Sequence, residues 1–257
     1  MHMKFSVPTA ATLLASGLLL VTGHTAPTPV GSPVVVTTYN ITSGIPPEGL
    51  SSIGFPIIIH DAVEGYSIGQ AVQFGHITTN QGTLALQPYQ NSAGSTLVRA
   101  VYSSYVPGTT TSDKARCRNP GTPDGPVIVC TWSVPAIYNT PYYLRIWHTG
   151  DSTWSVSVNN ACLQLPIPLG TFALPDDAGL IQASDYGFVE YLPWTSVEQP
   201  DCSTLPYQRS TFWIPAESTV WGFPEQTGAC AGEINASVGR LGTTLEVRSG
   251  FPGQTGA

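Results

Sequence analysis

Helical periodicity is almost absent from this chain, and that constrains its fold more than any other feature. Short runs rich in Val, Ile, Thr, Tyr, Phe and Trp alternate with Gly, Pro, Asn and Ser, a pattern typical of all-β sandwiches and barrels. No internal repeat or linker divides these runs. We therefore predict an all-β fold, with residues 27–257 forming a single β-sandwich or jelly roll whose loops are stapled by disulfides.

The expected strands follow the apolar and β-branched runs. The clearest hairpin joins residues 142–148 to 153–158 through a turn at residues 149–152. Residues 178–184 are ambiguous. The predicted strands are residues 34–39, 55–60, 66–75, 83–89, 96–105, 127–134, 142–148, 153–158, 187–192, 210–214, 219–223 and 243–248.

The N-terminus has the pattern of a secretory signal peptide. Lys4 precedes an apolar run at residues 10–21, which is too short to cross a bilayer, and small residues follow at Gly23 and Ala26. We predict that residues 1–26 are the signal and that the protein is secreted or stays in the secretory pathway. No later apolar run reaches 18 residues, so no transmembrane segment is expected.

Charge is scarce, which excludes one class of partner. Charged residues make up 10% of the chain, the net charge is −7, and the nine Lys and Arg residues are scattered. Without a basic patch to neutralise phosphates, nucleic-acid binding is not expected. Two sequons, at Asn40 and Asn235, predict N-linked glycans, which would supply the solubility that charge does not. The oligomeric state stays open.

The chain has five cysteines, and in a secreted protein cysteines are expected to form disulfides. Cys117 and Cys130 bracket a run of turn-forming residues, so their bridge is the first expectation. Cys202–Cys230 is the second, which leaves Cys162 free and buried. None of the spacings suits zinc or a CxxC redox pair.

The familiar catalytic signatures are missing. The chain has no GxSxG, HExxH, Walker loop, GxGxxG or EF-hand loop, and no organic cofactor is expected. A Gly-Asp-Ser triplet at residues 150–152 is better explained as hairpin-turn chemistry than as a nucleophile. A sandwich of this kind can bind a ligand, bind a metal, or shape a reaction that needs little chemical help.

One face of the expected strand 142–148 carries Tyr143, Arg145 and Trp147. An arginine between two aromatic rings suits a ligand: the guanidinium would hold an anionic oxygen while the rings stack on a flat substrate. The alternative is an edge strand on which Arg145 simply reaches solvent.

A second candidate face carries Tyr186, Phe188 and Glu190. If Glu190 is buried in an apolar strand, its carboxyl must be paired, protonated or metal-bound, which makes it an acid/base candidate. The alternative is a solvent-facing edge position.

Calcium is the metal this sequence supports best, because calcium prefers several loop oxygens. Asp61 and Glu64 form one acidic turn, and Asp176 and Asp177 form another. Solvated loop carboxylates are the alternative explanation.

Residues 82–87 and 186–191 resemble an uncharacterised family of secreted jelly-roll domains. The chain as a whole, through its signal peptide, sequons, strand content and missing motifs, resembles the glycosylated, calcium-dependent hetero-Diels–Alderases of fungal tropolone–sesquiterpene biosynthesis. This second resemblance is one of overall character and assigns no residue.

That resemblance implies a mechanism. A hydroxymethyl tropolone or related phenol loses water to give an ortho-quinone methide, which adds across a humulene-type alkene in a [4+2] step. The protein, a cyclase in meroterpenoid biosynthesis, would assist the dehydration and orient both partners. In this hypothesis Arg145 holds the tropolone oxygens, Glu190 relays the proton, and Tyr143, Trp147 and Tyr186 stack on the substrate.

Other functions suit the same features. A lectin-like carbohydrate-binding protein would also be a secreted sandwich with exposed aromatic residues. A polysaccharide lyase or glycosidase is a further alternative, and a glycosidase would use a pair of carboxylates. A structural or effector protein of the cell surface would show none of these activities.

Overall fold

The computed structural model describes residues 33–253, apart from residues 42–43, 123–124, 161, 163–164, 196, 198–199, 214–217, 222–224, 227–229, 236 and 242–243. The expected signal peptide at residues 1–26 lies outside the described residues. Within them, no helix is long and apolar enough to cross a membrane.

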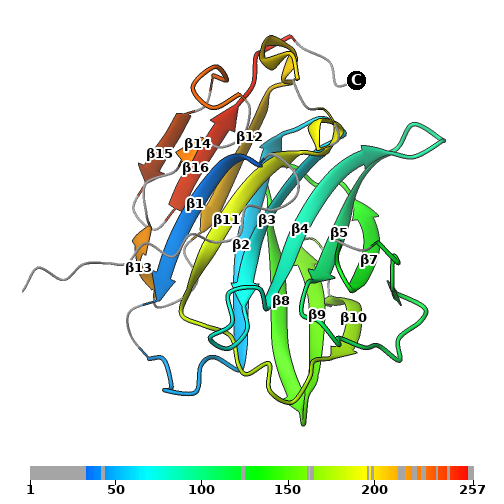
Figure 1. Ribbon diagram of the computed structural model, residues 1–257. Helices are drawn as coiled ribbons and strands as arrows, with labels where there is room; N and C mark the ends of the chain where they lie inside the picture. The colour runs from blue at the N-terminus through cyan, green and yellow to red at the C-terminus, as the bar shows by residue number, and fades with distance from the viewer. Residues whose placement is uncertain are drawn as a thin grey trace, which may run out of the picture.

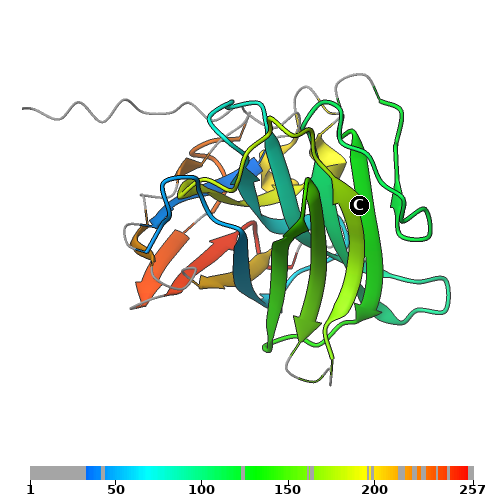
Figure 2. The ribbon, with the colours of Figure 1, turned by 90° about the horizontal axis from the view of Figure 1, so that it is seen from below.

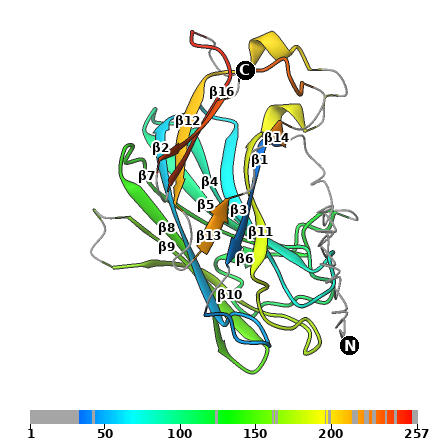
Figure 3. The same cartoon turned by 90° about the vertical axis from the view of Figure 1, so that its left-hand side faces the viewer.

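The described strands form two antiparallel sheets that lie face to face, as a β-sandwich (Figure 1 and Figure 3). The first is a nine-stranded sheet in which β14 (Glu225–Gln226) pairs with β1. Its remaining strands, in spatial order, are β13 (Ser218–Trp221), β1 (Pro33–Ile41), β11 (Ser184–Tyr191), β3 (Tyr66–Gln73), β4 (Gln81–Gln90), β5 (Thr96–Ser104), β7 (Ile128–Pro135) and β6 (Cys117–Arg118).

The second is a seven-stranded sheet. Figure 2 shows it from below, with the β8–β9 hairpin at the near end. Two short 3-10 turns, η1 (Leu192–Trp194) and η2 (Cys202–Thr204), follow β11 in the sequence. The strands, in spatial order, are β10 (Ile167–Ala173), β9 (Thr153–Asn160), β8 (Pro141–Gly150), β2 (Ser52–Asp61), β12 (Gln208–Trp213), β16 (Thr244–Ser249) and β15 (Ser237–Leu241).

The all-β prediction and its main strands are confirmed, including the β8–β9 hairpin with Asp151 at φ 48°. Four strands were not predicted from the sequence: β6, β10, β14 and β15. β10 was hidden because it contains Pro168 and Gly170, which weaken a strand pattern but are tolerated at a sheet edge. A Cβ at Gly170 would lie 2.2 Å from the Cys117 sulfur, so glycine is needed there for packing.

Apolar side chains gather on both sides of the nine-stranded sheet. The main core fills the space between the sheets and takes Ile68 and Val72 from β3 and Leu84 and Leu86 from β4. A small separate cluster lies on the opposite, outer face and consists of Ala71, Ala85, Tyr186 and Phe188. The two-residue period of a strand explains this division, since neighbouring residues point to opposite faces.

Both expected disulfides are present. Cys117–Cys130 joins directly paired residues of β6 and β7, and Cys202–Cys230 ties η2 to a later loop. Such bridges are typical of proteins that fold in an oxidising compartment. The remaining cysteine, Cys162, is free but exposed, so the expectation that it is buried was wrong.

Both sequon asparagines are exposed. Asn40 is near the end of β1, and Asn235 lies in the loop before β15. Each is therefore accessible to the glycosylation that the sequence predicts.

Candidate functional site

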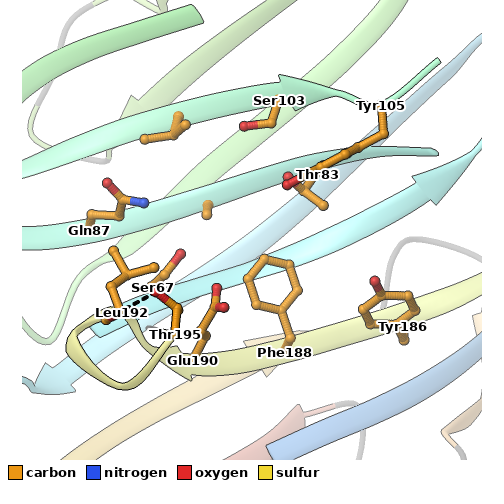
Figure 4. A pocket seen from close by; sticks show the side chains of 12 residues that line it. Ser67, Thr83, Gln87, Ser103, Tyr105, Tyr186, Phe188, Glu190, Leu192 and Thr195 are labelled. Carbon is orange, nitrogen blue, oxygen red and sulfur yellow. Dashed lines mark hydrogen bonds between the residues drawn. The ribbon is translucent and has the colours of Figure 1, made fainter. Parts of the chain in front are cut away.

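A pocket of about 230 Å³ opens on the outer face of the nine-stranded sheet. Its wall comes from β11, β3, β4 and β5, with η1 closing one end (Figure 4). This volume is enough for one ring-sized group and is small compared with most ligand pockets. The lining residues are Ser67, Thr83, Ala85, Gln87, Val101, Ser103, Tyr105, Tyr186, Phe188, Glu190, Leu192 and Thr195.

Strand register arranges these residues in three rows that run across the sheet. At one end is a polar row, which pairs Glu190 with Ser67 and continues to Gln87, one position beyond the Ile68–Leu86 pair. Neighbouring strands lie about 4.8 Å apart, so the members of a row are close enough for one ligand to touch several of them.

The middle row is apolar. Phe188 pairs with Gly69, Gly69 with Ala85, and Ala85 with Val101. It lies two residues, or about 7 Å, along the strands from the polar row.

The third row is rich in hydroxyl groups. Thr83 and Ser103 form its centre and pair with each other. Tyr186 of β11 lies on one side of this pair, and Tyr105 follows Ser103 by two residues on the other side. Figure 4 shows Glu190, Ser67 and Gln87 at one end of the pocket and Tyr186, Thr83 and Tyr105 at the other. A flat ligand on the middle row would therefore have polar groups at both of its edges.

Small residues make the hollow. A Cβ at Gly69 would lie 2.7 Å from Phe188 Cζ and 2.8 Å from Ala85 Cβ, so any larger residue would displace the ring or fill the floor. The Phe188 ring in turn lies beside Tyr186, with ring centroids 6.2 Å apart. The floor and the aromatic wall are thus packed against each other.

Glu190 is the carboxylate of this pocket. Burial away from water raises the pKa of its carboxyl to about 7, because the charged form loses hydration. Leu192 and Thr195, which follow Glu190 closely in the chain, line the same end of the pocket. At neutral pH a substantial fraction of Glu190 is therefore protonated and able to donate a proton.

Two tyrosines complete the polar lining at the far end. Burial raises the pKa of the Tyr105 hydroxyl, and the charge of Glu190 across the pocket raises it further, so Tyr105 stays a hydrogen-bond donor. Tyr186 donates to the side-chain oxygen of Gln81 at 3.2 Å, which fixes its ring. The pocket thus combines a proton donor, fixed hydroxyls and an apolar surface.

The structure separates the two halves of the site that the sequence suggested. Tyr186 and Glu190 line the pocket, whereas Tyr143, Arg145 and Trp147 lie on β8 of the seven-stranded sheet. Arg145 is exposed, contacts the Ser52 hydroxyl at 3.3 Å and stacks 5.4 Å from the Trp147 ring centre. The two groups cannot act on one small substrate, because they project from different sheets.

The acidic residues considered for calcium do not gather either. Within the described part of the chain, no three His, Cys, Asp or Glu side chains are close enough to share a metal. Asp61 and Glu64 precede β3, whereas Asp176 and Asp177 lie next to Ala178, whose carbonyl approaches Gly75 beyond the other end of β3. The two acidic turns are therefore separate from each other.

Each acidic turn has local hydrogen bonds instead. Glu64 accepts from the backbone N–H of Gln90 at 3.2 Å, and Asp176 accepts from the Ser152 hydroxyl. Calcium binding at these turns stays a prediction.

Sequence reasoning missed most of the pocket. Ser67, Thr83, Gln87, Ser103 and Tyr105 come from β3, β4 and β5 and meet Glu190 only through strand pairing. The available signal was on β4, where the buried Leu84 and Leu86 alternate with the small or polar residues Thr83, Ala85 and Gln87.

No family model and no curated protein matches the chain. Among solved structures, it is similar to scytalido-glutamic peptidase with a transition-state analog inhibitor, at 10% identity and a TM-score of 0.45, covering 84% of this chain and 97% of that one. The chain is also similar to SCP-B, a member of the Eqolisin family of peptidases in complex with a tripeptide. The identity is 9% and the TM-score 0.41, and the match covers 84% of this chain and 97% of SCP-B. A mutant of the alginate lyase Aly36B is similar at 11% identity and a TM-score of 0.23, and the match covers 62% of this chain and 68% of that one. These likenesses are too distant to indicate a function for this chain.

Proposed function

We propose that the protein is a cyclisation catalyst of the hetero-Diels–Alderase type. It assists the loss of water from a hydroxymethyl tropolone or related phenol and holds the resulting ortho-quinone methide in the pocket, where a humulene-type alkene meets it from the open side. The observation that carries this proposal is the Glu190 carboxyl, which has a pKa of about 7 at the end of an aromatic-walled pocket.

Glu190 supplies the acid. General acids work best when their pKa lies near the working pH, and a carboxyl raised to about 7 meets that condition where an ordinary glutamic acid does not. The proton on Glu190 passes to the leaving hydroxyl, the C–O bond breaks, and water departs. The ring hydroxyl of the substrate gives its proton to solvent and Glu190 regains one from solvent, so the net change is the loss of one water.

The middle row supplies orientation. Phe188, Ala85 and Val101 offer an apolar surface to a flat ring, and Tyr186 stands beside Phe188. The [4+2] step then forms one C–C and one C–O bond without proton transfer, so holding the partners in register is the main help it needs. Such positioning supplies up to about 7–11 kcal/mol in favourable cases.

Glycoside hydrolysis fits the pocket less well. That reaction uses two carboxyl groups across the scissile bond, and Glu190 is the sole carboxylate among the described lining residues.

Carbohydrate binding is a second candidate, at a different place. Tyr143 is 40% exposed, and the β8 face that it shares with Arg145 and Trp147 presents aromatic rings to solvent. Glycan-array binding that is lost in Tyr143→Ala and Trp147→Ala, and kept in Glu190→Gln, would support this candidate.

We place the reaction in the secretory pathway or outside the cell. The two disulfides and the exposed sequon asparagines support that location. Calcium is implied by the family resemblance alone, and no step is assigned to it.

The test uses protein purified from a eukaryotic secretion host, with a hydroxymethyl tropolone and a humulene alcohol as substrates. Adducts are followed by chiral LC–MS, with and without chelator. We expect one enantiomer, formed faster than background, and a loss of rate above about pH 7 as Glu190 ionises. Glu190→Gln should lower the rate by about 10²–10⁴-fold.

Glu233→Gln is the matched control, because it removes an exposed carboxyl outside the pocket and should leave the rate unchanged. Racemic adduct at the background rate, or full activity in Glu190→Gln, would contradict the proposal.

A further inference from the structure

The polar row of the pocket continues to an arginine. Gln87, which lines the pocket, is paired directly with Arg99 on β5. Side chains that are directly opposite in an antiparallel pair have Cβ atoms about 5 Å apart. The Arg99 side chain therefore begins beside Gln87 at the edge of the pocket, and its guanidinium lies over the Tyr89 ring, outside the residues that line the pocket.

Arg99 is a surface cation on β5, directly opposite Gln87. Its side chain is exposed, and its guanidinium lies 4.7 Å from the centre of the Tyr89 ring. Tyr89 is itself oriented by its hydroxyl, which donates to the Ser133 hydroxyl at 2.8 Å. Arg99 takes part in none of the ion pairs found in the described part of the chain.

Two acids lie near this row, and neither forms an ion pair with Arg99 in the described part of the chain. Glu64, the nearby acid at this end of β4, already accepts a hydrogen bond from the backbone N–H of Gln90. Glu190 is at the other end of the row, three strand spacings or about 14 Å from Arg99 between backbones. The row thus has a partly neutral acid at one end and a permanent cation at the other.

We propose that Arg99, supported by Tyr89, is an anion subsite of the Glu190 pocket and binds the ionised oxygens of an acidic aromatic ring. The planar guanidinium fork matches two adjacent oxygens of such a ring, and the ring itself rests on the middle row. This inference rests on the proposed function for the location of the ring, and it gives Arg99 the role that the sequence suggested for Arg145.

The test measures binding rather than turnover. The probes are tropolone at pH 8, where it is an anion, and 2-methoxytropone, its neutral ether, each titrated by calorimetry. We expect the wild-type protein to prefer the anion. Arg99→Gln should weaken tropolone binding by about five- to tenfold and leave the binding of the ether unchanged.

Arg145→Gln is the matched control. Arg145 also stacks on an aromatic ring, but on the other sheet, so its loss should leave both affinities unchanged. Arg99→Lys keeps the charge without the fork and should retain part of the preference. Circular dichroism checks that each variant is folded.

The inference is overturned if neither probe binds, if Arg99→Gln keeps the wild-type preference, or if Arg145→Gln loses it. The two proposals can fail separately. Normal turnover in Glu190→Gln together with a lost anion preference in Arg99→Gln would remove the proposed reaction and leave the anion subsite standing.

Discussion

The Phe188 ring lies directly over Gly69, on the neighbouring strand of the pocket floor. A Cβ at Gly69 would come within 2.7 Å of Phe188 Cζ and within 2.4 Å of the Leu84 carbonyl oxygen. The ring could turn away, but the carbonyl belongs to the β3–β4 pairing and cannot move without disturbing it. The shape of the pocket floor therefore depends on the absence of a side chain at Gly69.

Gly69→Ala should destabilise the protein by about 1–3 kcal/mol, because the new methyl overpacks this position. Urea unfolding measures the change. Gly54→Ala is the control: Gly54 is also in a strand, and its nearest new contact, the Leu144 carbonyl oxygen at 3.7 Å, is ordinary. If both variants unfold at the same urea concentration, the close packing described here is incorrect.

Glu190 should make stability depend on pH. The pKa of its carboxyl is about 7 in the folded protein and near 4.5 when unfolded, so the folded state binds more protons between these values. The contribution of the protonated carboxyl is fully present below pH 4.5 and is lost as pH rises through 7. Relative to Glu190→Gln, the wild type should lose about 2–3 kcal/mol between pH 4 and 8.

Denaturant unfolding across this pH range checks the prediction. Glu233→Gln should follow the wild-type curve, because it removes an exposed carboxyl without altering the pocket. Parallel curves for wild type and Glu190→Gln would show that Glu190 ionises as freely as in the unfolded chain.

Gln70 is a buried amide whose nitrogen and oxygen have no hydrogen-bond partner in the part of the chain that the structure describes. Burying a polar group without a hydrogen-bond partner costs about 1–3 kcal/mol of stability. Gln70→Met, which keeps the length without the amide, should therefore raise the free energy of unfolding by about 1 kcal/mol.

Gln73→Met provides the contrast on the same strand. The Gln73 amide donates to the Gly75 carbonyl at 3.2 Å, so its removal should not stabilise the protein. A loss of stability in Gln70→Met would indicate an unseen partner, such as a buried water.

One thiol should react with maleimide in the native protein, and five after reduction and unfolding, because only Cys162 is free and it is exposed. Removal of the Cys117–Cys130 bridge by a double alanine substitution should cost about 3 kcal/mol, which is the effect expected from closing a loop of this length in the unfolded chain. Thiol titration by mass spectrometry and urea unfolding measure the two effects. Two reactive thiols, or none, would contradict this pairing.

Each exposed sequon should carry one glycan in a eukaryotic secretion host. Asn40→Gln and Asn235→Gln should each remove one glycan, and the double variant should be insensitive to peptide N-glycosidase. Intact-mass analysis reads this directly. A wild-type mass equal to that of the bare chain would overturn the prediction.

Alternation along single strands was readable from the sequence, and it placed Tyr186, Phe188 and Glu190 on one face. It also separated Tyr143, Arg145 and Trp147 from the buried residues of β8. A two-residue period carries this information because it depends on each strand alone.

Sheet membership was not readable in the same way. Glu190 and Arg145 were grouped because both lie among aromatic residues, but β11 and β8 belong to different sheets. The partners of Glu190 come from β3 and β4, more than 100 residues earlier in the chain, and β1 pairs with β11 across a similar gap. Such long-range pairing leaves no local trace in the residues themselves.

The pocket's position outside the sandwich has a consequence for how the protein tolerates change. On β11, Tyr186, Phe188 and Glu190 face the pocket, whereas Val189 and Tyr191 belong to the core between the sheets. Saturation mutagenesis of this strand, read once for secreted yield and once for ligand binding, should give two interleaved profiles with a period of two. Substrate preference could then diversify at every second position while the fold is inherited unchanged through the others.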